Sequence, residues 1–432
     1  MITKRLRVLI VAHEFSPSQG SECAVGWNIV KGISLYHDVT VIYAESNHFN
    51  TSNYSRSVRD FIDRNPDLSF KAIPVPQPLI SRLIAWFNKL VSFSKSGIGL
   101  APLYFIAYRQ WQKKAYREAE HLLANEKFDI VHQLTAISFR APGYLHRSNL
   151  PLVWGPSSGM VKIPSAFYSI LPFKYILYEQ FRRLSNYIQG YLSVNVARMA
   201  QRASVIYAVT EDDYYFFSKV SAGKVYQMLD VGTYTNNFSF DFRKQNEKLQ
   251  ILWVGRIVYS KAINLLIDAI LINPAKFKVV EFIIVGDGPL LEKYMQLSQQ
   301  YHLDMIRWKG NLPHSEVLEL FKRSDLLVHT SIKEATSAVV MEALTYGLPV
   351  ICHDAFGMGI AINDTCGIKV PLKTPQISRE GFYNALVSFI DNPDMLNRLR
   401  KGAIIRAKEI SWEANAKRIA NDYCSIVEGK LK

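Results

Sequence analysis

The sequence predicts an α/β protein with two doubly wound parallel sheets. Short apolar runs alternate with longer helical patterns in the first half, as a parallel sheet requires, and the alternation restarts at residue 251. Between the two halves the pattern stops near residues 229–237, and residues 239–248 are polar and charged. At 432 residues the chain is also long for one domain. We therefore predict a first domain over 1–237, a second over 238–410 that begins within a linker, and a final helical segment over 411–432.

The apolar runs give the predicted strands in order. In the first half they span Leu6–Ala12, Val39–Ala44, Ser69–Ile73, Phe128–His132, Pro151–Trp154 and Val205–Val209. In the second half they include Ile251–Val254, Phe282–Val285 and Leu326–Val328. Ligands of doubly wound sheets bind outside the carboxyl ends of the strands. The loops that follow these runs are therefore the candidate sites.

Three loops of the first half carry candidate residues. After the first strand, Glu14 precedes Gly20 and Ser21, where a missing side chain and a suitable cap open the start of a helix to a phosphate. His132 ends the fourth strand, and the fifth runs into the turn Gly155-Pro156-Ser157-Ser158-Gly159. Taken alone, each feature is also consistent with an ordinary turn or a satisfied structural histidine.

Positive charge and small residues follow the strands of the second half. Arg256 comes directly after the strand at 251–254, and Lys261 follows five residues later. Two fixed cations at a crevice suit a diphosphate, although either alone would be an ordinary surface cation. The next strand leads into the small-residue turn Gly286-Asp287-Gly288-Pro289, and Lys309-Gly310-Asn311-Leu312-Pro313 follows.

The most informative stretch covers residues 325–350. An apolar strand is followed by a polar loop, and Thr336 or Ser337 is able to cap a helix that ends near Gly347. Free N–H groups at a helix start, with the positive end of the helix dipole, attract a phosphate. Glu334 precedes the cap and Glu342 lies inside the helix. A glutamate within a helix is most often a solvated residue, so the context must decide its role.

This stretch resembles the signature of retaining nucleotide-sugar glycosyltransferases of family 4, in which two glutamates are separated by seven residues. The similarity includes Glu334, Glu342-Ala343-Leu344 and Gly347-x-Pro349-Val350. Ser337 stands where the family often has glycine, as do Ser21 and Ala262 at two further positions. The resemblance implies the GT-B fold, in which two Rossmann-like doubly wound domains face each other across a cleft and the last helix crosses back to the first domain.

The resemblance also implies roles for individual residues. Glu334 would contact the donor sugar, Arg256 and Lys261 would neutralise the leaving diphosphate, and His132 would face the reaction centre. The implied donor-binding residues are Gly20, Gly286, Leu312, Thr336, Ser337, Ala338, Val339 and Glu342. Of these, Glu342 would contact the ribose. The acceptor-side candidates are Glu14, Ser21, Gly155 and Ser157.

The amino-acid composition indicates where in the cell the protein is located. The four cysteines are scattered without metal or disulfide spacing, as in a reduced cytosolic protein. The apolar run after Lys4, Arg5 and Arg7 is shorter than a secretory signal and meets His13-Glu14, so we interpret it as a strand. No stretch reaches the roughly 18 uninterrupted apolar residues of a membrane span. We therefore expect a cytoplasmic protein.

The net charge of +14 is concentrated in two basic, aromatic stretches. No acid lies between Asp67 and Glu118, and the stretch from Phe167 to Arg202 contains only Glu179. The first stretch contains the bases Lys71, Arg82, Lys89, Lys95, Arg109, Lys113, Lys114 and Arg117 and the aromatics Trp86, Phe87, Phe93, Tyr104, Phe105, Tyr108 and Trp111. This interleaving suits the headgroup zone of an anionic membrane, or else the apolar residues pack on the core. Without a known nucleic-acid-binding motif, we expect no nucleic-acid partner.

Together these observations predict a retaining glycosyltransferase that moves a sugar from a nucleoside diphosphate to a saccharide or lipid-linked acceptor. No Asp-x-Asp occurs, so we expect neither a metal clamp nor a cofactor, and a UDP- or GDP-sugar as donor. Lipid-linked acceptors suit capsule, lipopolysaccharide or extracellular polysaccharide assembly at the inner face of the cell membrane. The alternatives are a GT-B epimerase or phosphorylase, and a non-catalytic basic protein that binds membrane or nucleic acid.

Overall fold

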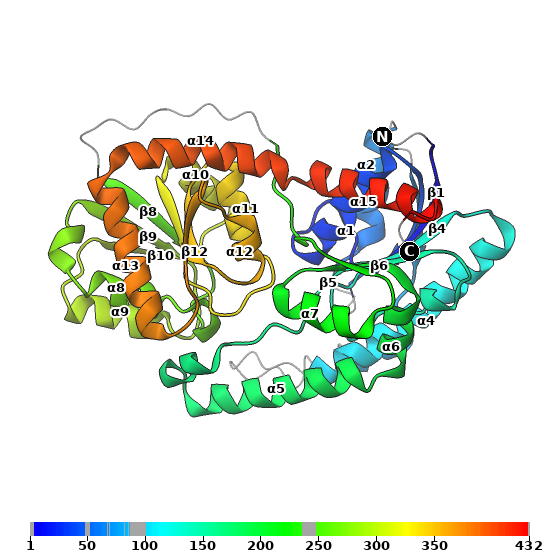
Figure 1. Cartoon of the computed structure of the whole chain (residues 1–432), viewed down its shortest axis with the longest axis horizontal. Coiled ribbons are helices and arrows are strands. Elements are labelled where there is room, and N and C mark those ends of the chain that lie inside the picture. The colour runs from blue at the N-terminus through cyan, green and yellow to red at the C-terminus, as the bar shows by residue number, and fades with distance from the viewer. Residues whose placement is uncertain are drawn as a thin grey trace. The chain divides into compact units, whose positions relative to one another are not determined.

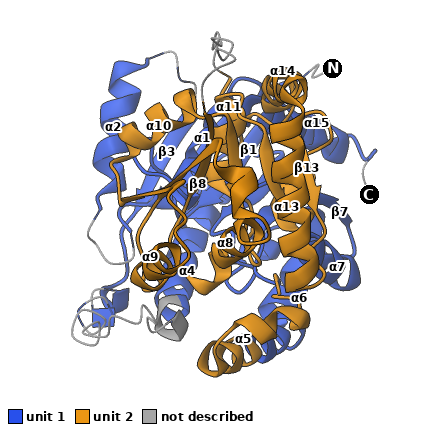
Figure 2. Cartoon of the chain, turned by 90° about the vertical axis from the view of Figure 1, so that its left-hand side faces the viewer, with its two compact units in different colours: residues 1–160, 183–230, 412–432 blue, residues 161–182, 231–411 orange. Residues whose placement is uncertain are grey.

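The chain folds into two compact units. The computed structural model describes residues 4–47, 52–66, 68, 70–81, 83–84, 86, 101–235 and 248–430. The first unit comprises residues 1–160, 183–230 and 412–432, and the second comprises residues 161–182 and 231–411 (Figure 2). Each unit is built around one parallel sheet with helices on its faces (Figure 1).

The first unit contains a seven-stranded parallel sheet in the order β3-β2-β1-β4-β5-β6-β7. Its strands are β1 (Arg7–Ala12), β2 (Asp38–Ala44), β3 (Phe70–Val75), β4 (Ile130–Thr135), β5 (Leu152–Ser157), β6 (Ala203–Ala208) and β7 (Lys224–Gln227). The six predicted strands are present, because each apolar run is long enough to cross a buried sheet. The short, partly exposed β7 was not predicted.

The helices of the first unit come from distant parts of the chain. They are α1 (Glu22–Ser34), α2 (Tyr54–Arg64), α4 (Ala101–Asn125), α6 (Val194–Arg202), α7 (Glu211–Val220), α15 (Trp412–Val427) and the short turn η1 (Leu145–Arg147). The C-terminal helix α15 packs on α1. Gly32 permits this close approach, since a Cβ there would lie 2.4 Å from the Cβ of Ala416.

The second unit contains a six-stranded parallel sheet in the order β10-β9-β8-β11-β12-β13. Its strands are β8 (Leu249–Val254), β9 (Val280–Val285), β10 (Ile306–Gly310), β11 (Leu326–His329), β12 (Val350–His353) and β13 (Gly367–Val370). The helices are α8 (Asn264–Ile270), α9 (Leu291–Gln300), α10 (His314–Arg323), α11 (Ala338–Thr345), α12 (Phe356–Ala361), α13 (Pro375–Asp391) and α14 (Pro393–Glu409), with 3₁₀ turns η2 (Ser165–Ile170), η3 (Tyr259–Lys261) and η4 (Pro274–Phe277).

Residues 161–182 depart from the predicted domain division. We placed them in the first domain, over 1–237, yet they cluster with the second unit. Ile163, Phe167 and Leu171 are buried in the hydrophobic core of that unit. Helix α5 (Phe173–Tyr191) begins in the second unit and ends in the first. Residues 236–247 of the predicted linker lie outside the described part of the chain.

Each sheet has one point at which the strand order reverses. In the first unit this point lies between β1 and β4, and in the second it lies between β8 and β11. The loops after the two strands diverge there, which leaves a crevice at the carboxyl edge of the sheet. The fold therefore directs attention to the loops after β1 and β4, and to those after β8 and β11. Among the helices described, none is long and apolar enough to cross a membrane.

Candidate active site

Two opposite charges meet at the reversal point of the second sheet. The Lys261 ammonium contacts Oε2 of Glu334, and the two side chains are 22% and 20% exposed. Lys261 ends the 3₁₀ turn η3 after β8, and Glu334 lies in the loop after β11. Thr330 fixes the first loop, because its hydroxyl donates to the Lys261 carbonyl at 2.7 Å and accepts from the indole of Trp253 at 3.0 Å. The pair is thus held in place with one side open to solvent.

Two buried histidines support the loop that carries Glu334. His329 and His353 are the last residues of the adjacent strands β11 and β12. His329 Nε2 lies 3.8 Å from a Glu334 oxygen, and burial together with the charge of Lys261 holds the His329 pKa well below its ordinary value. His353 donates from Nδ1 to the Ser331 carbonyl at 3.0 Å, and burial lowers its pKa to about 4. Both rings are therefore neutral, and the sequence analysis missed them.

Helix α11 presents its N-terminus beside this loop. Ser337 occupies the cap position, but its side chain makes no capping hydrogen bond, contrary to the prediction that Thr336 or Ser337 caps the helix. The Thr336 hydroxyl is buried and has no hydrogen-bond partner among the described residues. Ala338 and Val339 form the first turn, where N–H groups have no intrahelical acceptor. Uncapped N–H groups at the positive end of the helix dipole suit an anion.

A cavity of about 420 Å³ lies at the carboxyl ends of β8 and β9, on the side of β8 that faces away from β11. It is lined by Val254, Gly255, Arg256, Val285, Gly286, Asp287, Gly288, Asn311, Leu312 and Val317. The Arg256 side chain is exposed and takes part in no hydrogen bond or ion pair between described residues. Gly286 has a φ of +134°, and a Cβ there would lie 1.9 Å from the Gly255 carbonyl oxygen. The cavity therefore requires glycine at 286 and offers a free guanidinium.

Glu342 connects helix α11 to helix α10. Its Oε1 lies 3.0 Å from Nε2 of His314, the first residue of α10. The same helix supplies Val317 to the cavity, and the segment before it supplies Leu312. All predicted residues of the second half therefore lie in the loops and helix starts at the carboxyl edge of one sheet. They are Arg256, Lys261, Gly286, Leu312, Glu334, Thr336, Ser337, Ala338, Val339 and Glu342.

A buried ion-pair network connects the loop that carries Glu334 to helix α5. The Lys333 ammonium lies 2.9 Å from a carboxylate oxygen of Glu179 on α5. Glu179 is fully buried and also pairs with Arg182, which in turn donates to the Val161 carbonyl. Burial alone would raise the Glu179 pKa, but the hydrogen bonds from Arg182 and Lys333 outweigh it and lower the pKa. The sequence offered no local signal for a pair so far apart in the chain.

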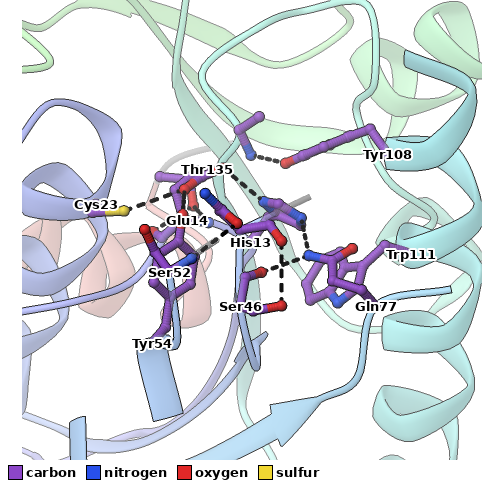
Figure 3. Close-up of polar contacts among 12 residues, drawn as sticks. His13, Glu14, Cys23, Ser46, Ser52, Tyr54, Gln77, Tyr108, Trp111 and Thr135 are labelled. Atoms are coloured by element: carbon purple, nitrogen blue, oxygen red, sulfur yellow. Dashed lines mark hydrogen bonds and ion pairs between the residues drawn. The ribbon is translucent and has the colours of Figure 1, made fainter. Parts of the chain in front are cut away.

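In the first unit, Glu14 anchors a polar cluster at the reversal point (Figure 3). The carboxylate accepts from Tyr54 and, at 3.2 Å, from the Cys23 thiol. The Glu14 backbone exchanges two hydrogen bonds with the Thr135 hydroxyl, at 3.1 and 3.0 Å. Burial raises the Glu14 pKa, but the charge of His13 and the hydrogen bonds from His13, Tyr54 and Cys23 outweigh it and lower the pKa to about 2. Glu14 is therefore a fixed, ionised acid.

His13 extends this cluster toward the next loop. Its ring packs between Tyr108 and Trp111, with centroid distances of 4.6 and 4.7 Å. Its Nδ1 lies 3.0 Å from Glu14, and its Nε2 lies 3.0 Å from the amide nitrogen of Gln77. The imidazole therefore joins the Glu14 carboxylate to the Gln77 amide through its two ring nitrogens. His13 was not predicted as a site residue, although it directly follows β1.

Gly20 and Ser21 lie at the exposed start of α1. Ser21 occupies the cap position with φ 56°, but its side chain makes no capping hydrogen bond, so the predicted cap is wrong. A Cβ at Gly20 would meet no atom within 4 Å. The glycine that the fold requires is Gly26, where a Cβ would lie 2.2 Å from the Glu14 carbonyl oxygen. The role of Gly20 in donor binding stays a prediction.

His132 does not face a crevice. We predicted that β4 ends at this residue, but the strand continues to Thr135, so His132 lies within the sheet. Its Nε2 donates to the Gly155 carbonyl at 2.6 Å, and its Nδ1 accepts from the hydroxyl of Tyr423 on α15. The ring is fully buried, and burial lowers its pKa to about 4. The predicted role at the reaction centre is therefore replaced by a structural one.

Gly155 and Ser157 are also structural. We predicted a turn that presents them to an acceptor, but β5 continues through Ser157. A Cβ at Gly155 would lie 2.5 Å from the Tyr207 carbonyl oxygen. The Ser157 hydroxyl donates to the Ile137 carbonyl at 3.1 Å and is fully buried. Glu14 and Ser21 lie after β1 at the carboxyl edge of the first sheet. Ser157 ends β5 at the same edge but is buried, and Gly155 lies within β5.

Comparison with known proteins adds to this geometry. Residues 235–406 match the model of the family described as "Glycosyl transferases group 1". An alpha-D-kanosaminyltransferase of Streptomyces kanamyceticus is 28% identical over 180 residues, which are 41% of this chain and 45% of that protein. The gpi3 subunit of the Schizosaccharomyces pombe phosphatidylinositol N-acetylglucosaminyltransferase is 35% identical over 124 residues, which are 28% of this chain and 27% of that protein. The chain thus spans less than half the length of each curated relative.

The fold extends beyond the matched region. Sucrose-phosphate synthase from Thermosynechococcus elongatus superposes with a TM-score of 0.63 at 16% sequence identity, covering 98% of this chain and 100% of that one. With the two doubly wound sheets, this similarity confirms the predicted GT-B fold class. The second unit, which contains the candidate site, therefore matches a glycosyltransferase family in sequence, and the similarity in fold extends over nearly the whole chain.

Proposed function

We propose that the protein is a glycosyltransferase that moves a sugar from a nucleoside diphosphate to an acceptor hydroxyl. The observation that carries this proposal is the convergence at one sheet edge of two kinds of group. Arg256, Lys261 and the uncapped start of α11 supply positive charge. Glu334 and Glu342 supply carboxylates within the same unit. A diphosphate linked to two polyhydroxylated rings requires both kinds.

Each group has a defined part in the proposed reaction. Arg256, Lys261 and the N–H groups of α11 stabilise the charge that develops on the diphosphate as the anomeric carbon–oxygen bond breaks. Glu334 accepts a hydrogen bond from a hydroxyl of the donor sugar, and Glu342 accepts one from a hydroxyl of the ribose. The acceptor oxygen bonds to the anomeric carbon from the same face, and its proton passes to the departing phosphate. The products are a glycoside with retained configuration and a nucleoside diphosphate.

The finer assignments belong to the same proposal. We propose a UDP- or GDP-sugar as donor, without a metal or cofactor, because fixed cations and helix amides meet the leaving charge. We propose a saccharide or lipid-linked acceptor, in agreement with a relative whose name includes phosphatidylinositol. Assembly of capsule, lipopolysaccharide or extracellular polysaccharide at the inner membrane face would use such an acceptor. A non-catalytic binding protein would leave the paired glutamates and cations without a use.

Donor binding is the first test. Purified protein is heated with UDP, GDP, ADP, CMP or their sugar conjugates, because a ligand that binds only the folded state raises the melting temperature. We expect stabilisation by one nucleoside diphosphate and its sugar conjugate, and loss of this stabilisation in Arg256→Ala. Arg398→Ala, which removes an exposed arginine from α14, is the matched control and keeps it. Absence of any nucleotide effect on the wild type would contradict the proposed function.

A further inference from the structure

Helix α5 exposes a continuous row of large apolar side chains to solvent. The helix has 19 residues, from Phe173 to Tyr191. The exposed fractions are 77% for Phe173, 60% for Leu177, 45% for Tyr178, 67% for Phe181, 58% for Leu184, 59% for Tyr187, 46% for Ile188, 40% for Tyr191 and 69% for Leu192. Soluble proteins rarely expose an uninterrupted apolar patch of this kind unless it has a partner.

The exposed residues form one face of the helix. Phe173, Leu177, Phe181, Leu184 and Ile188 are spaced by three or four positions, which places them on one stripe along the helix. Tyr187 and Tyr191 follow along its side, with rings 5.0 Å apart. The sequence left two alternatives for the apolar residues of this basic stretch, a membrane surface or the protein core. In the structure the stripe on α5 is exposed and does not pack on the core.

The opposite face of α5 attaches the helix to the protein. Glu179 is buried there and pairs with Arg182 and Lys333. Further along, the amide of Asn186 donates to the Gly159 carbonyl at 2.7 Å. Gly190 lies against Met160, whose Cε would be 2.5 Å from a Cβ at this position. Tyr175 and Ile176 also pack against the core of the second unit. The helix is therefore attached through residues outside the exposed apolar stripe.

The charge around the stripe is almost entirely positive. Residues 161–202 contain six lysines and arginines and a single acid, Glu179. That acid is buried and neutralised by its two partners. Lys174 and Arg198 are exposed. Basic residues beside exposed Phe, Leu and Tyr complement an anionic lipid surface, whose headgroups attract the cations and whose acyl boundary accepts the apolar side chains.

The first basic, aromatic stretch contributes less to this picture. Arg82, Phe87, Lys89, Phe93 and Lys95 lie outside the described residues, as does the side chain of Tyr104. Tyr108 and Trp111 are buried against His13, so the membrane prediction is wrong for these two rings. Trp86 is 63% exposed. The surface that carries the inference is therefore α5.

We propose that α5 is a membrane-docking helix that lies in the headgroup zone of an anionic bilayer, with its Phe173–Ile188 stripe toward the acyl chains. This surface deepens the proposed function, since an enzyme placed at the lipid surface meets acceptors that are anchored in it. The same helix holds Glu179, which pairs with the residue next to Glu334. The part of α5 that carries Glu179 belongs to the second unit, and it joins the docking helix to the loop that carries Glu334.

The test is flotation with lipid vesicles. Full-length protein is mixed at low salt with vesicles of phosphatidylcholine containing about a third phosphatidylglycerol. We compare wild type with the α5 variant Leu177→Gln/Phe181→Gln/Leu184→Gln, in which three exposed positions receive a residue that favours helix formation. The matched control is Leu35→Gln/Ile405→Gln, which removes apolar side chains that are 64% and 61% exposed elsewhere.

We expect wild type and control to float with the vesicles and the α5 variant to lose at least tenfold in bound fraction. A wild type that stays wholly in solution, or an α5 variant that binds equally well, would overturn the proposal. Sedimentation velocity without lipid gives the remaining outcome: a wild-type dimer that the α5 variant abolishes would assign the stripe to a second copy instead. Nucleotide stabilisation of the α5 variant is measured in parallel, so that failure of docking and failure of donor binding are distinguished.

Discussion

The ammonium of Lys333 lies 2.9 Å from the carboxylate of Glu179, which is fully buried. These residues are 154 positions apart in the chain, and the contact ties α5 to the loop that carries Glu334. A buried acid in such a contact is stabilised only while its cations remain. The geometry of the donor loop therefore depends on a residue that has no contact with the proposed substrate.

Replacing Glu179 with glutamine should destabilise the second unit. The variant leaves Lys333 and Arg182 partly buried without a counter-charge, at a cost of roughly 3 kcal/mol. We expect a lower melting temperature and reduced transferase activity. Glu319→Gln breaks an exposed pair with Lys322 and should change neither. Equal melting temperatures for the two variants would show that the Glu179 network contributes little.

The two glutamates of the donor site should differ in their kinetic effects. Glu334→Gln is expected to lower kcat strongly while nucleotide stabilisation is kept, because the proposed contact of Glu334 is with the sugar. Glu342→Gln is expected to weaken nucleotide stabilisation, because its proposed contact is with the ribose. Steady-state kinetics and thermal shift on both variants separate the roles. Identical profiles would contradict the assignment.

Loss of a cation should slow the departure of the diphosphate. Lys261→Ala removes the charge beside Glu334 and is expected to reduce kcat by about 100-fold or more, the effect of losing one preorganised group at a developing anion. Activity is measured with a saturating donor, and circular dichroism checks the fold. An alanine variant with wild-type kcat would remove Lys261 from the mechanism.

Three glycines allow a graded test of backbone strain, and one of them, Gly286, lines the cavity. Gly286→Ala should be the most damaging, because its Cβ would collide with the Gly255 carbonyl and its φ is +134°. Gly310 has a φ of +64°, but a Cβ added there would meet no atom within 4 Å. For Gly310→Ala we therefore expect only backbone strain, of about 1–2 kcal/mol. A Cβ added at Gly20 would meet no atom within 4 Å, so Gly20→Ala should leave the unfolding free energy unchanged. Denaturant unfolding and nucleotide shift should rank them in this order.

Acid should destabilise the protein first through its buried histidines. Burial lowers the pKa of His132 and of His353 from 6.5 to about 4, so the unfolded chain binds more protons between these values. The stability that these residues contribute is fully present above pH 6.5. It is lost as the pH falls toward 4, by up to about 1.4 kcal/mol per pH unit for each histidine. Glu14 adds a later loss between pH 4.5 and about 2.

Denaturant titrations at several pH values check this order. His353→Gln should flatten the fall in unfolding free energy between pH 6.5 and 4. His314→Gln is the control, since its side chain is 69% exposed. A wild-type stability that stays constant over this range would contradict the prediction.

The sequence predicted the fold because parallel strands buried on both faces appear as apolar runs. It also assigned Arg256, Lys261, Glu334 and Glu342 to loops and a helix after strands, and the structure places them at one sheet edge. Their chemical roles stay predictions. This edge was predictable because the signals are local. Arg256, Lys261 and Glu334 are charges in loops that follow strands, and Glu342 lies in the helix after one of these loops.

The errors arise where the outcome depends on partners distant in sequence. His132 looked like a strand end, but the strand continues and α15 supplies its partner Tyr423. Residues 161–182 were placed in the wrong unit because nothing in their composition shows which core they join. The composition of the stretch from Phe167 to Arg202 did not show whether its apolar residues face the core or the solvent. Each error concerns tertiary packing, which a one-dimensional pattern does not encode.

The division of the chain has a consequence for synthesis. The first unit includes α15, and His132 in its sheet accepts a hydrogen bond from Tyr423 of that helix. A ribosome therefore releases nearly the whole second unit before the part of the first unit that completes its core. The unit made first is finished last, and until then Nδ1 of the sheet residue His132 lacks its partner Tyr423. Premature termination before α15 would thus damage the N-terminal unit, although every residue of its sheet had already been translated.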